Sequence, residues 1–210
     1  MPRGPSGPSG LWLPAEPLVL ASRSRVRQTL LESAGIPVEV KPADIDERGL
    51  APRAPSQAPG AVAALLAREK ASAVARLHPG HLTLGADQTL ALGAERLVKP
   101  SDRNAAHKQL RALAGRSHEL HSAIVFVQDT TILFEHVGVA RLTMRALSDR
   151  FLEFYLDAVG GAATASVGAY QLEGLGIQLF ERIDGDYFTI LGLPLLAALD
   201  FLRRRGCLAQ

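Results

Sequence analysis

The stretch LVLASRSRVRQTLLESAG, residues 18–35, passes from a short apolar run into a segment with helical spacing, and it decides the fold class. Leu18–Leu20 is typical of a short buried strand, and apolar residues then recur at helical intervals as far as Ala34. Gly35 follows, and glycine often ends a helix because it adopts the left-handed backbone conformation without strain. A strand that leads directly into a helix indicates an α/β protein.

The remainder of the chain continues this alternation of strand and helix patterns. We predict further strands at Val38–Val40, His81–Asp87, Glu119–Gln128, Ile132–Met144 and Ile177–Ile183. We predict helices at about residues 60–77, 102–113, 149–159 and 193–204. The two long β-rich runs in the middle of the chain look like an antiparallel pair. The sequence therefore predicts an α/β fold with a mixed sheet and flanking helices.

The composition is that of a globular protein. Of the 210 residues, 47% are hydrophobic and 21% are charged, and the net charge is only +2, so disorder of the whole chain is excluded. Cys207 is the only cysteine, which excludes a disulfide framework and fits a reducing cytoplasm. No apolar run approaches the ~20 residues that span a bilayer, so we expect a cytoplasmic protein with no membrane partner.

One domain is expected after a short extension. Residues 1–17 are rich in proline and glycine and are predicted to be flexible, whereas residues 18–206 carry the strand and helix patterns of a single domain. Lysines and arginines are scattered among acids, and one Trp and three Tyr cannot form an aromatic stripe on which bases would stack. Nucleic acid is therefore not an expected partner.

The turn after the first strand carries hydroxyl and guanidinium groups. Ser22, Ser24 and Arg27 lie where a strand enters a helix. The N-terminus of a helix attracts anions, and arginine binds phosphate through two nitrogens, so this turn predicts a phosphate site. A serine N-cap surrounded by solvated arginines is the alternative.

Acidic and basic residues elsewhere suggest further parts of a site. Asp87 ends the predicted strand His81–Asp87, where ligands collect in open α/β sheets, although it could instead cap the next turn. Asp44–Glu47 contains three acids, which could hold a divalent cation or form a solvated loop. Lys70 and Lys99 could bind the charge of a substrate, although lysines are more often surface residues.

Taken together, these segments resemble a known family. The matches in the first half of the chain are Ala21-Ser-Arg-Ser-Arg-Val-Arg27, Asp46-Glu47, Arg68-Glu-Lys-Ala71, Gly85-Ala-Asp87 and Lys99-Pro-Ser-Asp102. Those in the second half are Leu113-Ala-Gly-Arg-Ser-His118, Gly174-Leu-Gly176, Phe180-Glu-Arg-Ile183, Gly185-Asp-Tyr187 and Gly192-Leu-Pro194. Because they follow the order and approximate spacing of the Maf family, the chain from about Leu18 to Arg204 is similar to that family.

The resemblance implies a fold and an activity. It implies the ITPase-like (Maf/Ham1) fold, in which a mixed sheet forms two lobes around a central cleft. It also implies a nucleoside triphosphate pyrophosphatase that cleaves between the α- and β-phosphates with a divalent cation, Mg²⁺ or Mn²⁺, and that forms a homodimer. The family is also linked to inhibition of septum formation, so a non-catalytic nucleotide-binding regulator of cell division is the alternative.

The resemblance further implies roles for individual residues. Asp87 would act as the base, Lys70 and Lys99 would stabilise charge in the transition state, and Glu47 would share the metal with Asp87. Residues implied to bind the phosphates are Ser22, Ser24, Arg27, Lys70 and Lys99.

Three positions concern the nucleobase. Gln88 and Glu173 resemble the 7-methyl-GTP pyrophosphatase branch of the family, which usually has Trp where this chain has Val26. A carboxylate such as that of Glu173 can accept two hydrogen bonds from a guanine edge and favours the positive charge of an N7-methylated ring. We therefore expect Val26, Gln88 and Glu173 to determine specificity, with a salt-bridged surface position as the alternative for Glu173.

Overall fold

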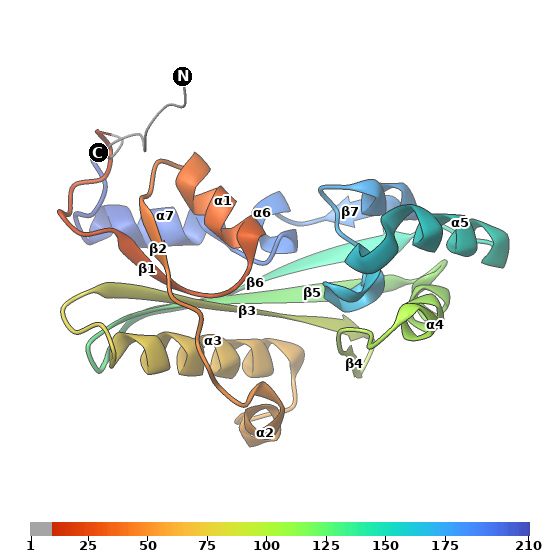
Figure 1. Ribbon diagram of the computed structural model, residues 1–210, viewed down its shortest axis with the longest axis horizontal. Helices are drawn as coiled ribbons and strands as arrows, with labels where there is room; N and C mark the ends of the chain where they lie inside the picture. Colours follow the sequence, from red (N-terminus) through yellow and green to blue (C-terminus); the bar gives the residue numbers. More distant parts are fainter. Residues whose placement is uncertain (1–9) are drawn as a thin grey trace.

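The computed structural model describes residues 10–210, which fold around a single mixed sheet (Figure 1). Within these residues the sheet has seven strands. Six of them are adjacent in the order β2-β1-β3-β5-β6-β7, and the seventh, β4, pairs with β3. Their bounds are β1 Leu18–Ala21, β2 Val38–Val40, β3 Leu82–Leu92, β4 Glu95–Leu97, β5 Ser117–Gln128, β6 Thr131–Met144 and β7 Phe180–Asp184. β1 runs parallel to β2 and to β3, and the other pairs are antiparallel. The predicted mixed α/β sheet is confirmed.

Helices cover both faces of the sheet (Figure 1). α2 and α3 lie below the sheet in this view, and α1, α6 and α7 lie above it. The helices are α1 Arg25–Ser33, α2 Glu47–Leu50, α3 Pro59–Ala75, α4 Arg103–Leu113, α5 Asp149–Val159, α6 Tyr187–Ile190 and α7 Leu195–Arg204. In the described part of the chain, no helix combines the length and the apolar character needed to cross a membrane.

Local sequence signals explain several of the helix ends. Asp102 caps α4 by accepting a hydrogen bond from the Ala105 amide at 2.8 Å, and Ser148 caps α5 in the same way through Phe151. Gly35 has a φ of +78° just after α1, as the predicted helix end requires.

Two predicted strands differ from the observed ones by three or more residues at one end. The strand expected to end at Asp87 continues to Leu92, because β5 pairs with it along its whole length. The strand expected from Ile177 begins only at Phe180, because Leu175–Leu179 forms a 3₁₀ turn. The first correction matters for function, since Asp87 lies in the middle of a strand.

A row of small and polar residues divides the apolar core on one face of the sheet. On that face of β3, Leu84 and Ala86 belong to one core cluster and Leu90 to another, with Gln88 between them. Gln88 pairs with Ser122 on β5, and Ser122 pairs with Gly138 on β6, so the row crosses three strands. The two clusters form two lobes that share one continuous sheet.

The prediction of a flexible extension is wrong for residues 10–17. Trp12 is only 6% exposed and forms a β-bridge with Leu208. The Leu13 amide donates to the Cys207 carbonyl at 3.0 Å, and the Ala209 amide donates to the Leu11 carbonyl at 2.9 Å. A tryptophan buries a large apolar area, so this contact holds the segment against the C-terminus. Residues 1–9 lie outside the described residues.

Candidate functional site

A gap in the sheet lies beside the middle of β3. The parallel pairing with β1 ends where Ala21 meets Gly85, and the antiparallel pairing with β4 begins only at Leu90. Among the described residues, the four positions Ala86–Thr89 therefore pair with β5 on one side and with no strand on the other. At ~3.3 Å per residue the gap is roughly 13 Å long. Asp87 lies inside it, next to the carboxyl end of β1 rather than at the end of its own strand.

Arg27 occupies part of this gap. Its Nη1 atom donates to the Ala86 carbonyl at 2.8 Å and to Ser22 Oγ at 3.1 Å, and its Nε atom donates to the Gly192 carbonyl at 2.8 Å. Burial lowers the pKa of the Arg27 guanidinium, and the negative charges of Asp87 and Glu47 act in the opposite direction. The guanidinium remains charged, because arginine stays protonated in proteins. Arg27 thus joins three parts of the chain and leaves Nη2 for another acceptor.

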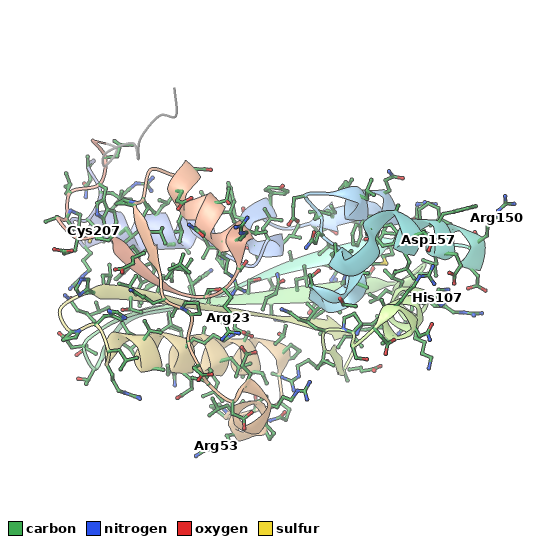
Figure 2. All side chains as sticks on the ribbon, viewed as in Figure 1. Arg23, Arg53, His107, Arg150, Asp157 and Cys207 are labelled. Atoms are coloured by element: carbon green, nitrogen blue, oxygen red, sulfur yellow. The ribbon has the colours of Figure 1, made fainter. Side chains whose placement is uncertain are left out.

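The two serines have separate tasks in the turn that leads to Arg27. Ser24 is the N-cap of α1 and accepts a hydrogen bond from the Arg27 amide at 3.4 Å. Ser22 is 7% exposed, and its Oγ accepts from the Ser24 amide at 3.2 Å as well as from Arg27. The expected N-cap is present, but Arg27 is bound to the protein rather than solvated. Figure 2 shows Arg23, which separates the serines, near the middle of the long axis of the molecule.

Lys70 brings two carboxylates together on the α3 face of the sheet. Its Nζ atom lies 2.5 Å from Asp87 Oδ1 and 2.9 Å from Glu47 Oε1. Asp87 is 8% exposed, and this burial raises the pKa of its carboxyl group, while the positive charges of Lys70 and Arg27 oppose the increase. Lys70, Asp87 and Glu47 therefore form one cluster, with Arg27 close enough to act on it electrostatically.

Small residues allow α3 to approach β3 so closely. A Cβ atom at Gly85 would lie only 2.1 Å from the Ala67 carbonyl oxygen, so no other residue fits there without movement of the helix. Ala67 and Ala71 are fully buried along this contact. Lys70 lies between these two alanines in sequence, and the close packing places its side chain over Asp87.

Glu47 reaches the cluster from a short helix that the sequence patterns did not predict. It is the first residue of α2, and Asp46 caps the helix by accepting a hydrogen bond from the Gly49 amide at 3.0 Å. Asp44 is exposed. Of the three acids in Asp44–Glu47, Glu47 is therefore the one that meets Asp87, through Lys70. Within residues 10–210, no three His, Cys, Asp or Glu side chains gather as metal ligands.

The structure does not bring Lys99 into this cluster. Lys99 is exposed in the segment between β4 and α4, and within the described chain it forms no ion pair and no side-chain hydrogen bond. Val26 lies in the first turn of α1, half-buried.

The opposite face of β3 carries Gln88. Its Nε2 atom donates to the carbonyl oxygens of Ile190 at 2.9 Å and Thr189 at 3.2 Å, and to Ser122 Oγ at 2.9 Å. Adjacent residues of a strand point to opposite faces, so Asp87 and Gln88 serve different sides of the sheet.

An apolar hollow of about 350 Å³ lies next to α6, on the Gln88 side. Residues lining it are Leu172, Glu173, Gly174, Ile177, Ile183, Gly185, Tyr187 and Ile190. Glu173 is exposed at this hollow and Tyr187 is half exposed. A mostly apolar cavity with one carboxylate is of the kind that binds a small organic ligand.

Sequence reasoning missed several residues of this region. The segments Gly185-Asp-Tyr187 and Gly192-Leu-Pro194 supported the family resemblance, but no role followed from their residue types. The contributions of Thr189, Ile190 and Gly192 are backbone carbonyls, which no sequence motif reveals. Ser122 could have been noticed as the one hydroxyl in the strand segment LHSAIVFV, which is apolar apart from Ser122 and His121.

The mixed sheet and this site define an α/β protein in which the turn from Ser22 to Arg27 lies beside a pair of carboxylates. The family model described as "Maf-like protein" matches residues 17–205, and the chain belongs to the Maf family. It is 61% identical to a "Nucleoside triphosphate pyrophosphatase" of Rhodopseudomonas palustris over 95% of this chain and 98% of that protein. It is 52% identical to a "7-methyl-GTP pyrophosphatase" of Mesorhizobium japonicum over 92% of this chain and 98% of that protein.

One solved structure is also similar to this chain. It is a HAM1 protein from Coxiella burnetii, with a TM-score of 0.40 and 17% sequence identity, covering 60% of this chain and 72% of that chain.

Proposed function

We propose that this chain, a hydrolase of the nucleoside triphosphate pyrophosphatase class, cleaves its substrate between the α- and β-phosphates in the gap beside β3. The observation that supports this site most directly is that Lys70 joins the carboxylates of Asp87 and Glu47, next to Arg27. Two acids and two cations in one place suit a reaction in which anionic phosphates meet a water molecule. The names of the relatives at 61% and 52% identity agree with this activity.

The proposed phosphate site is the turn at the start of α1 together with Lys70. Ser22, Ser24 and Arg27 lie at the end of the helix that attracts anions, and Nη2 of Arg27 makes no hydrogen bond within the described part of the chain. In the substrate complex, the Lys70 ammonium would interact with the α-phosphate as well as with the two carboxylates. Lys99 is exposed and has no side-chain partner among residues 10–210, so it is available to the outer phosphates.

A divalent cation fits the carboxylate pair. Asp87 and Glu47 both contact the Lys70 ammonium, so a divalent cation held by both carboxylates would bind beside this ammonium. Mg²⁺ is commonly held by one or two carboxylates together with substrate phosphates, and Mn²⁺ accepts the same oxygen ligands. When bound, the metal would supply positive charge to the phosphates and acidify coordinated water.

Asp87 is proposed as the base. The water oxygen forms a bond to the α-phosphorus while the bond to the oxygen bridging to the β-phosphorus breaks, and pyrophosphate leaves with that electron pair. Asp87 accepts the proton of the water, giving nucleoside monophosphate and pyrophosphate. Burial raises the pKa of Asp87, which brings it closer to the range in which a carboxylate is an effective base.

The hollow beside α6 is the proposed nucleobase site. Glu173 would accept hydrogen bonds from the edge of a guanine and would favour a 7-methylated ring, while the isoleucines exclude water. Val26 removes the aromatic wall that the 7-methyl-GTP branch usually has, and Tyr187 offers an aromatic ring within the hollow instead. Glu173 and Tyr187 favour 7-methyl-GTP whereas Val26 disfavours it, so 7-methyl-GTP is to be compared directly with unmodified nucleotides.

A panel of nucleoside triphosphates that includes 7-methyl-GTP and modified pyrimidines, with Mg²⁺ or Mn²⁺, tests the proposal. We expect equal amounts of nucleoside monophosphate and pyrophosphate. Release of orthophosphate and nucleoside diphosphate would contradict cleavage between the α- and β-phosphates. Tight nucleotide binding without any hydrolysis would instead favour a non-catalytic regulator of cell division.

A further inference from the structure

Three hydrogen bonds connect the middle of the sheet to the backbone of α6. Gln88 donates to the carbonyl oxygens of Thr189 and Ile190, and Ser122 Oγ donates to the Thr189 carbonyl at 2.7 Å. Ser122 is fully buried, and it also accepts a hydrogen bond from Gln88 at 2.9 Å. The two side chains therefore form a relay that ends on the α6 backbone.

This relay is one of the tertiary contacts that position α6, because the helix is too short to be stable by itself. It spans only Tyr187–Ile190, and a helix of one turn gains little from its internal hydrogen bonds. Thr189 also packs on Gly138, where a Cβ atom would lie 2.8 Å from Thr189 Oγ1. The position of α6 thus depends on the row Gln88–Ser122–Gly138 beneath it.

The same short segment meets both parts of the proposed site. Tyr187 and Ile190 line the apolar hollow, and Gly192 accepts the hydrogen bond from Arg27. Gln88 follows Asp87 directly in β3. A displacement of α6 relative to β3 would therefore move the wall of the hollow relative to the carboxylate that acts on the phosphate.

The side-chain nitrogen of Gln88 has little left to offer a nucleobase as a donor. An amide nitrogen has two hydrogens, and three protein acceptors already surround this one. Only Oε1 of this amide could contact a base directly, as an acceptor, whereas the hydrogen bonds to α6 give Gln88 an indirect route to specificity.

We propose that Gln88 and Ser122 are positioning residues for base recognition, which hold α6 so that the hollow and Asp87 accept one nucleotide together. This proposal rests on the proposed function of the site. It adds Ser122 to the functional residues and assigns Gln88 an effect that is transmitted through the α6 backbone.

Comparison of three substrates tests it. The variants are Gln88→Met and Ser122→Ala, assayed with 7-methyl-GTP, GTP and ribose 5-triphosphate, which carries the same phosphates without a base. For the nucleotides we expect kcat/KM to fall roughly 10-fold, mainly through KM, as for the loss of one or two buried hydrogen bonds. For ribose 5-triphosphate we expect a change below about 2-fold, because no base has to be placed.

Gln128→Met is the matched control. Gln128 donates an amide hydrogen bond to the Gly80 carbonyl at 2.8 Å, at the far end of β5, and should leave all three substrates unaffected. The double variant Gln88→Met with Ser122→Ala should lose little more than the larger single loss, because the two residues act in one relay.

Each of the other possible results would contradict a specific part of the proposal. Equal losses with and without a base would show that the relay serves the chemistry or general stability, and no loss would show that α6 needs neither residue. Should Gln88→Met fail to fold, Ser122→Ala alone decides by the same ratio of losses. A wild-type protein that hydrolyses none of the three substrates would contradict the proposed function itself.

Discussion

The two faces of β3 differ sharply at a single pair of neighbouring residues. On the α3 face, Asp87 meets the charged side chain of Lys70, and Glu47 completes the cluster. On the opposite face, Gln88 is neutral and is surrounded by a hydroxyl and two backbone carbonyls. In the proposed function, this one extended strand separates the chemistry of the reaction from the recognition of the substrate while keeping them one residue apart.

The packing around the two faces explains this division. Alanines on α3 and Gly85 on β3 let the helix approach until a lysine covers the acid. On the other face, the row Gln88–Ser122–Gly138 interrupts the apolar core, and α6 lies across the interruption. Each face can be altered separately, which gives the following predictions, from the largest expected effect to the smallest.

Asp87→Asn removes the proposed base from the charged face. The asparagine keeps the size of the side chain, so we expect the fold to persist while kcat for pyrophosphate release falls about 10³-fold, within the usual range for loss of a general base. Pyrophosphate release and thermal unfolding measure the two effects.

Asp157→Asn provides the control for a lost aspartate charge. Asp157 pairs with Arg103 at 2.6 Å on the surface, and it lies at the α5 end of the molecule, away from Arg23 (Figure 2). Near-normal turnover of Asp87→Asn would remove the proposed base.

Acidification should act on a residue of the Gln88 face. His118 is 1% exposed, its Nε2 lies 2.8 Å from the Tyr170 hydroxyl, and burial lowers the pKa of its imidazole from 6.5 to about 4. Between these values the unfolded chain binds a proton that the folded chain does not, so stability is lost as pH falls and is retained above 6.5. From pH 7 to pH 5 we expect His118 to cost about 2 kcal/mol of unfolding free energy.

Urea denaturation of the wild type and of His118→Gln at both pH values measures this cost. Glutamine does not titrate, so the variant should lose less stability than the wild type over the same interval. An equal loss in both proteins would show that His118 is not the group responsible.

Glu173→Gln tests the recognition side at the hollow. Removing the negative charge should shift preference from 7-methyl-GTP toward pyrimidine triphosphates, by about 10-fold in the ratio of kcat/KM, as for one lost charge-assisted hydrogen bond. Glu181→Gln, an exposed glutamate on β7, is the matched control. An unchanged ratio would refute the role of Glu173.

Lys99→Met should have the smallest effect. Because Lys99 is exposed, its interaction with an outer phosphate is worth at most about 1 kcal/mol, so KM should rise no more than about 5-fold with kcat nearly unchanged. Lys108→Met, an exposed lysine on α4, is the control. A large loss of kcat would show instead that Lys99 folds over the substrate and belongs to the charged cluster.

The sequence predicts most of the architecture because its signals are local. The apolar run at Leu18–Leu20, the capping residue Asp102 and the left-handed Gly35 each act within a few residues, and the structure confirms these elements. The limit of β3 is not local, because the partner strand β5 extends it beyond Asp87. The short helices α2 and α6 also escaped prediction, since a single turn has no periodicity and is held by tertiary contacts.

The candidate site follows the same rule. Residue types and their order pointed to Asp87, Lys70, Glu47 and Arg27, and the structure brings these four together. Lys99 also lies in a segment that resembles the family, but it does not contact the cluster. Its distance from the cluster depends on the path of the chain between β4 and α4, which the local sequence does not specify. The roles of backbone carbonyls at Thr189, Ile190 and Gly192 could not be foreseen, since any residue type supplies the same oxygen.

The bridge between Trp12 and Leu208 places the first and last described segments side by side at one end of the elongated molecule (Figure 1). The polypeptide is thus close to being a closed loop, fastened at a point remote from the lobe that contains α4 and α5. Such a topology suits circular permutation: a short glycine-rich tether could join the segment at Trp12 to the segment at Leu208, and new ends could be opened in a surface turn elsewhere. The noncovalent contact between Trp12 and Leu208 already holds together the two segments that such a tether would join.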